Sequence, residues 1–252
     1  MWLMFPASGE SQDVVQAPRL PSLSAIQAQD WKERREAFDA LIEVPETPAN
    51  ADRRRQLLFE LLTVENETVT TANARLQQRA ASGLPPEEGF TEGYTEYYAS
   101  AIAAVARLGD PRSATALAGA VSTGWMAIGT LIAFGAAAVE PVAQRITDAD
   151  VTLRSSATYT LSEMLTRSDA IAEDASSRSI IKKALSTAAR DSDPYVRRRT
   201  VAGLARLGDP ESIAIVQNLA LTDPYVDTVP GREGTYPVRE AAENALRSQR
   251  PR

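Results

Sequence analysis

The sequence predicts an all-α protein, built as a right-handed superhelix (an α-solenoid) of about five to six helix pairs. The first observation is repetition: the tetrapeptide Leu-Gly-Asp-Pro occurs at residues 108–111 and again at 207–210. The second is composition, since alanine is abundant, aromatic residues are few and long alternations of Val, Ile and Thr are missing; this favours helix over strand. A repeated helical unit cannot bury its apolar face alone, so it stacks against its neighbours.

Residues 1–24 are expected to form a flexible lead-in or the remnant of a signal peptide. Pro18 and Pro21 interrupt any helix there, and the apolar residues 2–5 are followed by small residues. This start resembles the end of a signal sequence, although a basic beginning is missing. We therefore favour an exported, periplasmic protein, with a cytoplasmic location as the alternative.

Residues 25–82 are expected to form a divergent N-terminal helical repeat. Helical periodicity begins near Ile26 and places Trp31 and Phe38 on one apolar face, until Pro45 ends the helix. A second helix follows, with Asp52 as its expected N-cap.

An acidic loop rich in Gly and Pro is expected at residues 83–93, and a regular repeat array at residues 94–252. Within the array, Arg154, Arg197 and Arg239 recur with the same apolar spacing after them, at offsets of 43 and 42 residues. Constant offsets that carry the same spacing indicate one structural unit used several times.

The fullest copy of the unit begins with Asp193-Pro194, continues with Val-Arg197, and ends at Gly208 before a second Asp-Pro pair. This pattern resembles HEAT repeats, in particular the short bacterial HEAT-like repeats also found in phycobilisome lyase-type proteins. The resemblance implies the solenoid fold and carries almost no information on function.

The resemblance covers residues 94–250 well and residues 26–65 loosely. Two departures from the repeat stand out. Gly124 occupies the position that Arg197 has in the fullest copy, and residues 227–237 are inserted between two repeat elements.

The repeated polar residues are explained by the fold. Asp193 is placed to cap a helix, Pro194 suits the first helical position, and Gly208 fits a left-handed helix end. Arg197 lies about one turn into the helix, where it can reach an aspartate or a carbonyl of the adjacent repeat. Catalysis or ligand contact is the alternative role. The structural repeat signature therefore consists of Asp193, Pro194, Arg197, Gly208, Arg154 and Arg239.

Cysteine and histidine are both absent, which excludes several classes of site. Structural zinc sites, most haem and iron–sulfur ligation, and Ser-His-Asp or Cys-His catalysis all need one of them. The HEAT-repeat hydroxylase of deoxyhypusine, whose fold the chain resembles, binds iron through His–Glu pairs and is excluded for the same reason. We expect no metal and no cofactor.

The net charge of −6 is concentrated in the first half of the chain. Residues 1–126 carry 11 Lys/Arg against 17 Asp/Glu, whereas residues 127–252 carry 16 of each. An acidic chain is a poor binder of polyanions, so we expect no nucleic-acid partner. The uncharged run at residues 113–139 is as long as a membrane span, but glycines interrupt it and it follows the repeat pattern. We expect buried helices there and no membrane span.

A basic segment is one candidate for partner binding. Residues 178–206 contain eight basic and two acidic residues, and Lys182, Lys183 and Arg198 are among the basic ones. A basic strip suits an acidic protein surface. The alternative is that these side chains form the solvated outer faces of two helices.

The insertion is the other candidate. Tyr225 and Tyr236 lie at its two ends, and Arg232 lies between them. Loops inserted into solenoids lie on one face, which is often the binding face. The alternative is a tolerated surface loop without a function.

Aromatic residues at helical spacing are expected to pack in the core or against loops, with an exposed aromatic patch as the alternative. They are Trp31, Phe90, Tyr94, Tyr97, Tyr98 and Trp125.

Together these observations favour a non-catalytic scaffold that binds a partner protein, of unknown identity, along the inner surface formed by the second helix of each pair. The chain is expected to be a monomer. The alternative, implied only by the phycobilisome lyase-type resemblance, is a chromophore (bilin) lyase or a subunit of one.

Overall fold

The computed structural model describes residues 19–85 and 87–248, and it confirms the all-α prediction. Helices make up 74% of the structure, and the described residues form thirteen α-helices and no strand. Two short 3-10 turns accompany them, η1 (Pro111–Ser113) and η2 (Gln144–Thr147). Most of the expected lead-in, residues 1–18, lies outside the described residues, as do residues 249–252.

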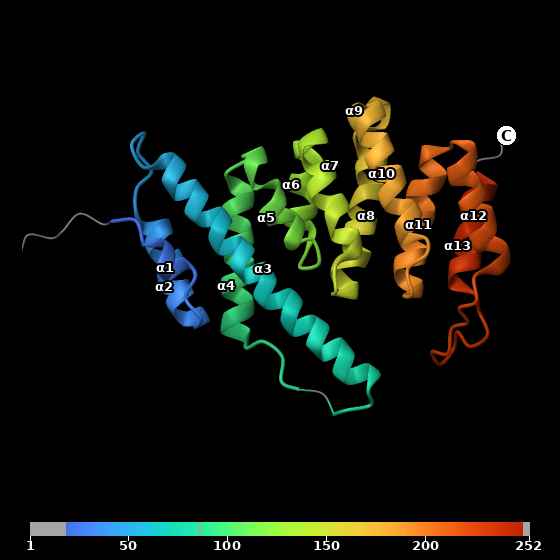
Figure 1. The fold of residues 1–252 in the computed structure, drawn as a ribbon, viewed down its shortest axis with the longest axis horizontal. Coiled ribbons are helices and arrows are strands. Elements are labelled where there is room, and N and C mark those ends of the chain that lie inside the picture. The colour runs from blue at the N-terminus through green and yellow to red at the C-terminus, as the bar shows by residue number, and fades with distance from the viewer. Residues whose placement is uncertain (1–18, 86, 249–252) are drawn as a thin grey trace, which may run out of the picture.

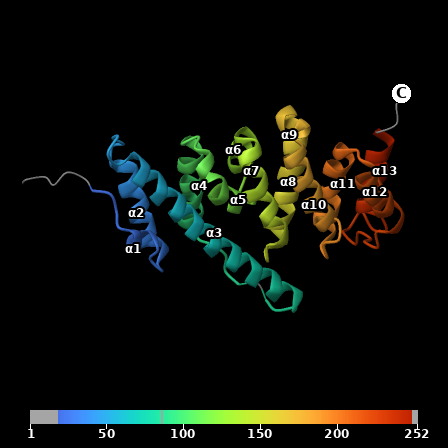
Figure 2. The same ribbon diagram turned by 45° about the horizontal axis from the view of Figure 1, so that its top comes forward.

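The longer helices fall into two sets, and each helix contacts the next member of its own set. The first set comprises α2 (Trp31–Glu43), α4 (Glu92–Arg107), α6 (Trp125–Phe134), α8 (Val151–Arg167), α11 (Pro194–Leu207) and α13 (Pro237–Ser248). The second set comprises α3 (Ala51–Ala81), α5 (Ala114–Gly119), α7 (Ala136–Ala143), α10 (Ala175–Ala188) and α12 (Pro210–Thr222). Figures 1 and 2 show the helices following one another along the long axis. The short helices α1 (Leu23–Ile26) and α9 (Asp169–Glu173) contact α2 and α8, respectively.

Aspartates and glycines set the helix ends. The side chains of Asp30, Asp150 and Asp193 each accept a hydrogen bond from the backbone N–H two residues further on, at 2.8 to 2.9 Å. This satisfies one of the N–H groups that a helix start leaves free. Gly109 and Gly208 adopt φ of 59° and 70°, the left-handed region that a glycine enters without strain.

A single hydrophobic cluster runs between the two sets. At Gly203, the Cβ of any other residue would lie 2.5 Å from both Leu185 Cδ1 and Ser162 Oγ, so the packing of α11 against its neighbours needs a glycine. The uncharged run contributes Leu117 and Leu131, which are fully buried. Within the described part of the chain, every helix falls short of the length and hydropathy that crossing a bilayer requires.

The helix α3 is unusually long. Its 31 residues correspond to roughly 45 Å, and its second half runs past the neighbouring helices to the start of α8 (Figures 1 and 2). There the amide groups of Asn73 and Gln77 donate to the two carboxylate oxygens of Asp150, at 3.0 and 2.8 Å. The end of α3 is thus tied to the N-cap residue of α8, far along the chain.

Three expected boundaries move. Leu23 and Ser24 belong to α1 and not to the lead-in. Asp52 does not cap the second helix: Asn50 occupies the N-cap position, at the end of a turn in which its backbone N–H donates to the carbonyl of Thr47, and the Asp52 carboxylate is bound to Arg112. The acidic loop ends at Thr91, whose hydroxyl accepts the N–H of residue 94 and so starts α4.

Candidate functional site

Arginines of the repeat signature join consecutive helices of the first set. The Nε and Nη2 groups of Arg197 donate to the Asp223 carboxylate at 2.6 and 3.0 Å, while its Nη1 donates to the carbonyls of residues 191 and 192. Arg154 makes the same four bonds, to the Asp191 carboxylate and to the carbonyls of residues 148 and 149. We call this arrangement an arginine clamp. It ties the loop before its own helix to the loop before the next first-set helix.

The Asp191 carboxylate of one clamp is held in the charged form. Burial alone would raise the pKa of Asp191, but the Arg154 guanidinium and the N–H of Asp193 bind its carboxylate and hold the pKa below the ordinary value. The Arg154–Asp191 pair therefore acts in holding the loop before α8 against the loop before α11.

A second kind of contact joins helices of the second set, and it engages Lys182. The Lys182 ammonium on α10 lies 2.8 Å from the Asp209 carboxylate and 2.7 Å from that of Glu211 at the start of α12. Burial opposes the ionisation of Asp209, but Lys182 and Ser212 lower its pKa overall. Lys182 was a candidate partner contact; in the structure it pairs within the chain.

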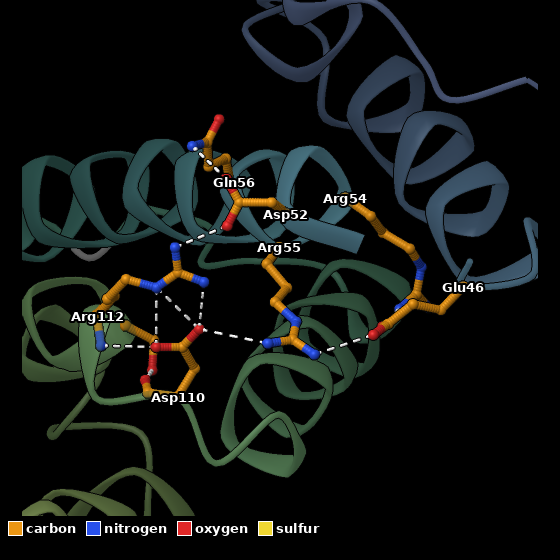
Figure 3. A network of polar contacts seen from close by, with 8 residues as sticks. Glu46, Asp52, Arg54, Arg55, Gln56, Asp110 and Arg112 are labelled. Carbon is orange, nitrogen blue, oxygen red and sulfur yellow. Dashed lines mark hydrogen bonds and ion pairs between the residues drawn. The ribbon is translucent and has the colours of Figure 1, made fainter. Parts of the chain in front are cut away.

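The first copy of the Leu-Gly-Asp-Pro tetrapeptide makes a similar network (Figure 3). The Asp110 carboxylate binds the Arg112 guanidinium at 2.7 Å and faces Arg55 of α3 at 3.8 Å. Arg112 also reaches Asp52 on α3 at 2.7 Å, and Arg55 binds Glu46 at 3.0 Å. In both copies the aspartate therefore faces a basic residue of the preceding second-set helix.

The most deeply buried charges form a closed cluster near the N-terminus. Arg34 of α2 donates through Nε and Nη2 to the Glu65 carboxylate of α3, and the hydroxyls of Tyr94 and Tyr97 donate to it at 2.8 and 2.9 Å. Burial, and then the charge of Glu65, raises the pKa of both tyrosines, so they stay protonated. Four donors saturate a fully buried carboxylate, which indicates a structural role and not a catalytic one.

Five other side chains form a row across the first-set helices α6, α8 and α11. The Trp125 ring packs edge-on against the Tyr159 ring, with 5.7 Å between centroids, and the Arg199 guanidinium carbon lies 5.3 Å from the centre of the same Tyr159 ring. One turn earlier on α11, the Tyr195 ring lies 6.4 Å from that of Tyr225, which follows α12. We call these five residues the aromatic row.

The two ends of the aromatic row coincide with the two departures from the repeat. Gly124 replaces the clamp arginine, and α6 begins only at Trp125, so this helix has 10 residues where α11 has 14. The missing first turn leaves Trp125 65% exposed, and the expectation that it packs in the core is wrong. At the other end, Tyr225 lies two residues before the insertion.

The basic candidates are not brought together. Arg198 lies on α11 beside the aromatic row, is exposed, and has no carboxylate partner among the described residues. Lys183 lies on α10 in the second set, where it lines a groove of 280 Å³ between α7 and α10. A neighbouring groove of 330 Å³ between α10 and α12 is lined by Arg190. The basic segment is therefore divided between two surfaces.

The inserted loop is organised by its own contacts. The backbone N–H of Asp227 donates to the carbonyl of Thr235 at 2.9 Å, and the Asp227 carboxylate lies 3.4 Å from Arg232. The Tyr236 ring lies 4.3 Å from the guanidinium carbon of Arg239, whose Nε donates to the carbonyl of residue 223 at 2.6 Å. Arg232 and Tyr236 thus pair with neighbours in or beside the loop, and only Tyr225 of the loop candidates belongs to the aromatic row.

Sequence reasoning missed most of the aromatic row, because Tyr159 on α8 lies far along the chain from Tyr195 and Arg199 on α11. The available signal was Gly124, which breaks the repeat immediately before a tryptophan. Tyr94, Tyr97 and Tyr98 are buried, in agreement with the core packing expected for them. Within the described residues, no group of acidic side chains is placed to hold a metal ion.

No protein-family model and no curated protein sequence matches the chain.

Proposed function

We propose that the chain is a non-catalytic scaffold that binds a partner protein, and that its helix pairs form a right-handed solenoid of HEAT-like repeats. Support for the solenoid comes from the order of contacts, because each helix touches the next member of its own set from α2 to α13. The arginine clamps support the repeat, since the same hydrogen bonds recur at Arg154 and Arg197.

The aromatic row, bounded by the two breaks in the repeat, is the observation that carries the binding function. Trp125 and Tyr195 are 65% and 47% exposed, although burial of such rings is normally favourable. Tyrosine, tryptophan and arginine are the residues that contribute most to protein interfaces. Residues that the stacking of the helices does not require, such as those of the aromatic row, are free to contact a partner.

The remaining charged residues of the repeat support a scaffold and not an enzyme. The buried ionisable groups are saturated by one another, as in the pairs Arg34–Glu65 and Arg197–Asp223. The residues of the aromatic row are stacked across helices without a nucleophile–base pair. They offer contact area and one cation, Arg199, and a second cation, Arg198, lies beside them, which suits recognition of a polypeptide.

The test is affinity capture from the native cell with three forms of the full chain. They are the wild type, the double variant Trp125→Ala/Tyr195→Ala, and the control Leu221→Ala, which removes an apolar side chain 76% exposed on α12. We expect one protein in stoichiometric amount with the wild type and the control, and its loss with the double variant. Mass spectrometry identifies it, and visible absorbance of the same fractions is recorded.

A coloured fraction without a partner protein would contradict the scaffold and support a chromophore-handling role. Equal recovery by all three forms would contradict the aromatic row as the binding site. Circular dichroism of each variant checks that the helices are intact.

A further inference from the structure

We propose that the aromatic row, together with Arg198, binds an extended acidic segment of the partner protein that also carries aromatic or proline side chains. This inference rests on the proposed scaffold function and adds the chemical class of the partner.

The charge of α11 is the first argument. Its sequence contains four arginines and no acidic residue. Arg197 is paired with the Asp223 carboxylate, and Arg206 donates a hydrogen bond to the carbonyl of residue 165. Arg198 and Arg199 are exposed and have no carboxylate partner in the part of the chain that the structure describes. Two neighbouring cations without counter-charges favour carboxylates on whatever covers them.

The nearest acidic side chain on the adjoining helix does not satisfy these cations. Glu163 of α8 lies one turn beyond Tyr159, and its carboxylate binds Arg167 at 2.5 Å. The positive charge at Arg198 and Arg199 therefore remains available to a ligand.

The ring arrangement is the second argument. Trp125 and Tyr159 are already packed edge to face, so binding loses little side-chain entropy. Met126, 50% exposed, extends the apolar surface beside Trp125. Flat rings exposed in this way are suited to the side chains of aromatic residues and proline.

The direction of the row is the third argument. It crosses α6, α8 and α11 in turn, and packed helices are about 8–10 Å apart. Two such steps and the contact from Tyr195 to Tyr225 span about 25 Å, which corresponds to about seven or eight residues of extended chain at 3.3 Å each. A ligand that follows this row crosses the helices, and an extended peptide is the simplest shape that does so.

A single-stranded nucleic acid also binds aromatic and basic surfaces, but the charges favour a peptide. A polynucleotide brings one phosphate per nucleotide, and its affinity depends on many cations. Here two free cations lie on a chain of net charge −6. A peptide with two or three carboxylates matches that supply, whereas a polynucleotide, with one charge per nucleotide, needs more free cations than these two.

The experiment is a selection from a display library of random 12-residue peptides on the immobilised full chain. Selected peptides are then synthesised with a fluorescent label, and their dissociation constants are measured by anisotropy. A 20-mer of deoxythymidine is measured in parallel. The variants are Arg198→Glu and Trp125→Ala, and the matched control is Lys183→Glu, which makes the same charge change in the groove between α7 and α10.

We expect selected peptides to be enriched in Asp and Glu together with Phe, Tyr, Trp or Pro. Arg198→Glu and Trp125→Ala should each weaken their binding by about tenfold or more, and Lys183→Glu by less than twofold. All changed side chains are exposed, so melting temperatures should stay near that of the wild type.

Three results would overturn the inference. Peptides without acidic enrichment would contradict the partner class. Peptides whose binding is unchanged by both Arg198→Glu and Trp125→Ala would contradict the surface. Peptides lost only with Lys183→Glu would move the site to the second-set groove and leave the scaffold function standing. Tighter binding of the oligonucleotide, lost with Arg198→Glu, would replace the peptide by a nucleic acid. Failure of the scaffold itself is read separately, from the absence of a captured partner in the native cell.

Discussion

Arg34 near the N-terminus and Arg154 in the middle of the chain make the same four hydrogen bonds in different surroundings. Each donates through Nη1 to the carbonyls five and six residues before it, and through Nε and Nη2 to one carboxylate. Each also lies four residues after the aspartate that caps its helix, Asp30 or Asp150. The N-terminal pair resembles the repeat only loosely in sequence. It nevertheless contains the four hydrogen bonds of an arginine clamp, with the carboxylate supplied by α3 and not by the loop before the next first-set helix.

The two clamps differ in what surrounds the carboxylate. Glu65 comes from the middle of a long helix, is fully buried, and is covered by Tyr94 and Tyr97. Asp191 comes from a short loop, and the Arg154–Asp191 side chains remain 16% and 9% exposed. Hydrogen-bond geometry is thus the feature that the clamps share, while the acceptor residue and its burial vary from one clamp to the next. The difference predicts unequal energetic roles.

The largest effect is expected from removing the buried clamp. Arg34→Met leaves the Glu65 carboxylate buried with two neutral donors, and we expect a loss of about 3–5 kcal/mol in the free energy of unfolding. Arg154→Met leaves Asp191 within reach of water, and about 1–2 kcal/mol is expected. Chemical denaturation measures both, with Lys32→Met, at an exposed position of α2, as the control. Equal losses in the free energy of unfolding for the two variants would show that burial and the tyrosine hydrogen bonds do not make the Arg34 clamp more important for stability than the Arg154 clamp.

A smaller effect is expected where α3 is bound to the N-cap residue of α8. Asp150 caps α8 and also receives the amides of Asn73 and Gln77. Asp150→Ala should therefore cost about 2–3 kcal/mol, against about 1 kcal/mol for Asp193→Ala, which removes a cap alone. Hydrogen exchange over residues 67–81 should accelerate in the first variant and not in the second. Unchanged exchange there would show that the second half of α3 is held by other contacts.

The next effect compares packing in a full helix with packing in the shortened one. Gly203→Ala on α11 places a Cβ 2.5 Å from Leu185 and Ser162, and about 1–3 kcal/mol of destabilisation is expected. Gly129→Ala on α6 meets nothing within 4 Å and should stabilise the protein by up to about 1 kcal/mol. Opposite shifts of the melting temperature check this pair, and shifts of the same sign would contradict it.

The smallest effect is expected from pH in the neutral range. The chain has no histidine, so its melting temperature should change little between about pH 6 and 8. In acid, Asp191 and Asp209 have lowered pKa values in the folded state, so their contribution is complete above the unfolded pKa of about 3.9 and is lost as the pH falls through the folded values. The decline should therefore begin only near pH 4. Thermal unfolding at a series of pH values measures it, and a step near pH 6 would contradict this account.

Much of the helical arrangement could be predicted, because its determinants are local. Asp193 caps α11, Pro194 occupies its first position, and Gly208 ends it in the left-handed region. Each of these choices depends on a few consecutive residues. The N-cap of α3 was predicted at Asp52, and this was wrong: Asn50 occupies that position, and Asp52 lies in the first turn, where its carboxylate pairs with Arg112, 60 residues away.

The candidate site could be predicted only in part. Tyr225 and Arg198 were singled out and lie in or beside the aromatic row, whereas Lys182 proved to be paired with Asp209 and Glu211. The sequence alone does not show whether a basic side chain faces solvent or pairs with a carboxylate on the next helix. Distinguishing Lys182 from Arg198 requires knowing which side chains the stacking brings opposite each other.

By itself, the sequence determined that the chain is helical, where many of its helices begin and end, and that chemistry based on histidine or cysteine is excluded. These properties follow from periodicity, capping residues and composition, which act over one or two helical turns. Only the tertiary structure decided that Glu65 and not an aspartate completes the clamp of Arg34, and that Trp125 stands exposed beside Tyr159. Both results depend on which helices lie side by side, and that is fixed by the summed packing of residues far apart in the chain.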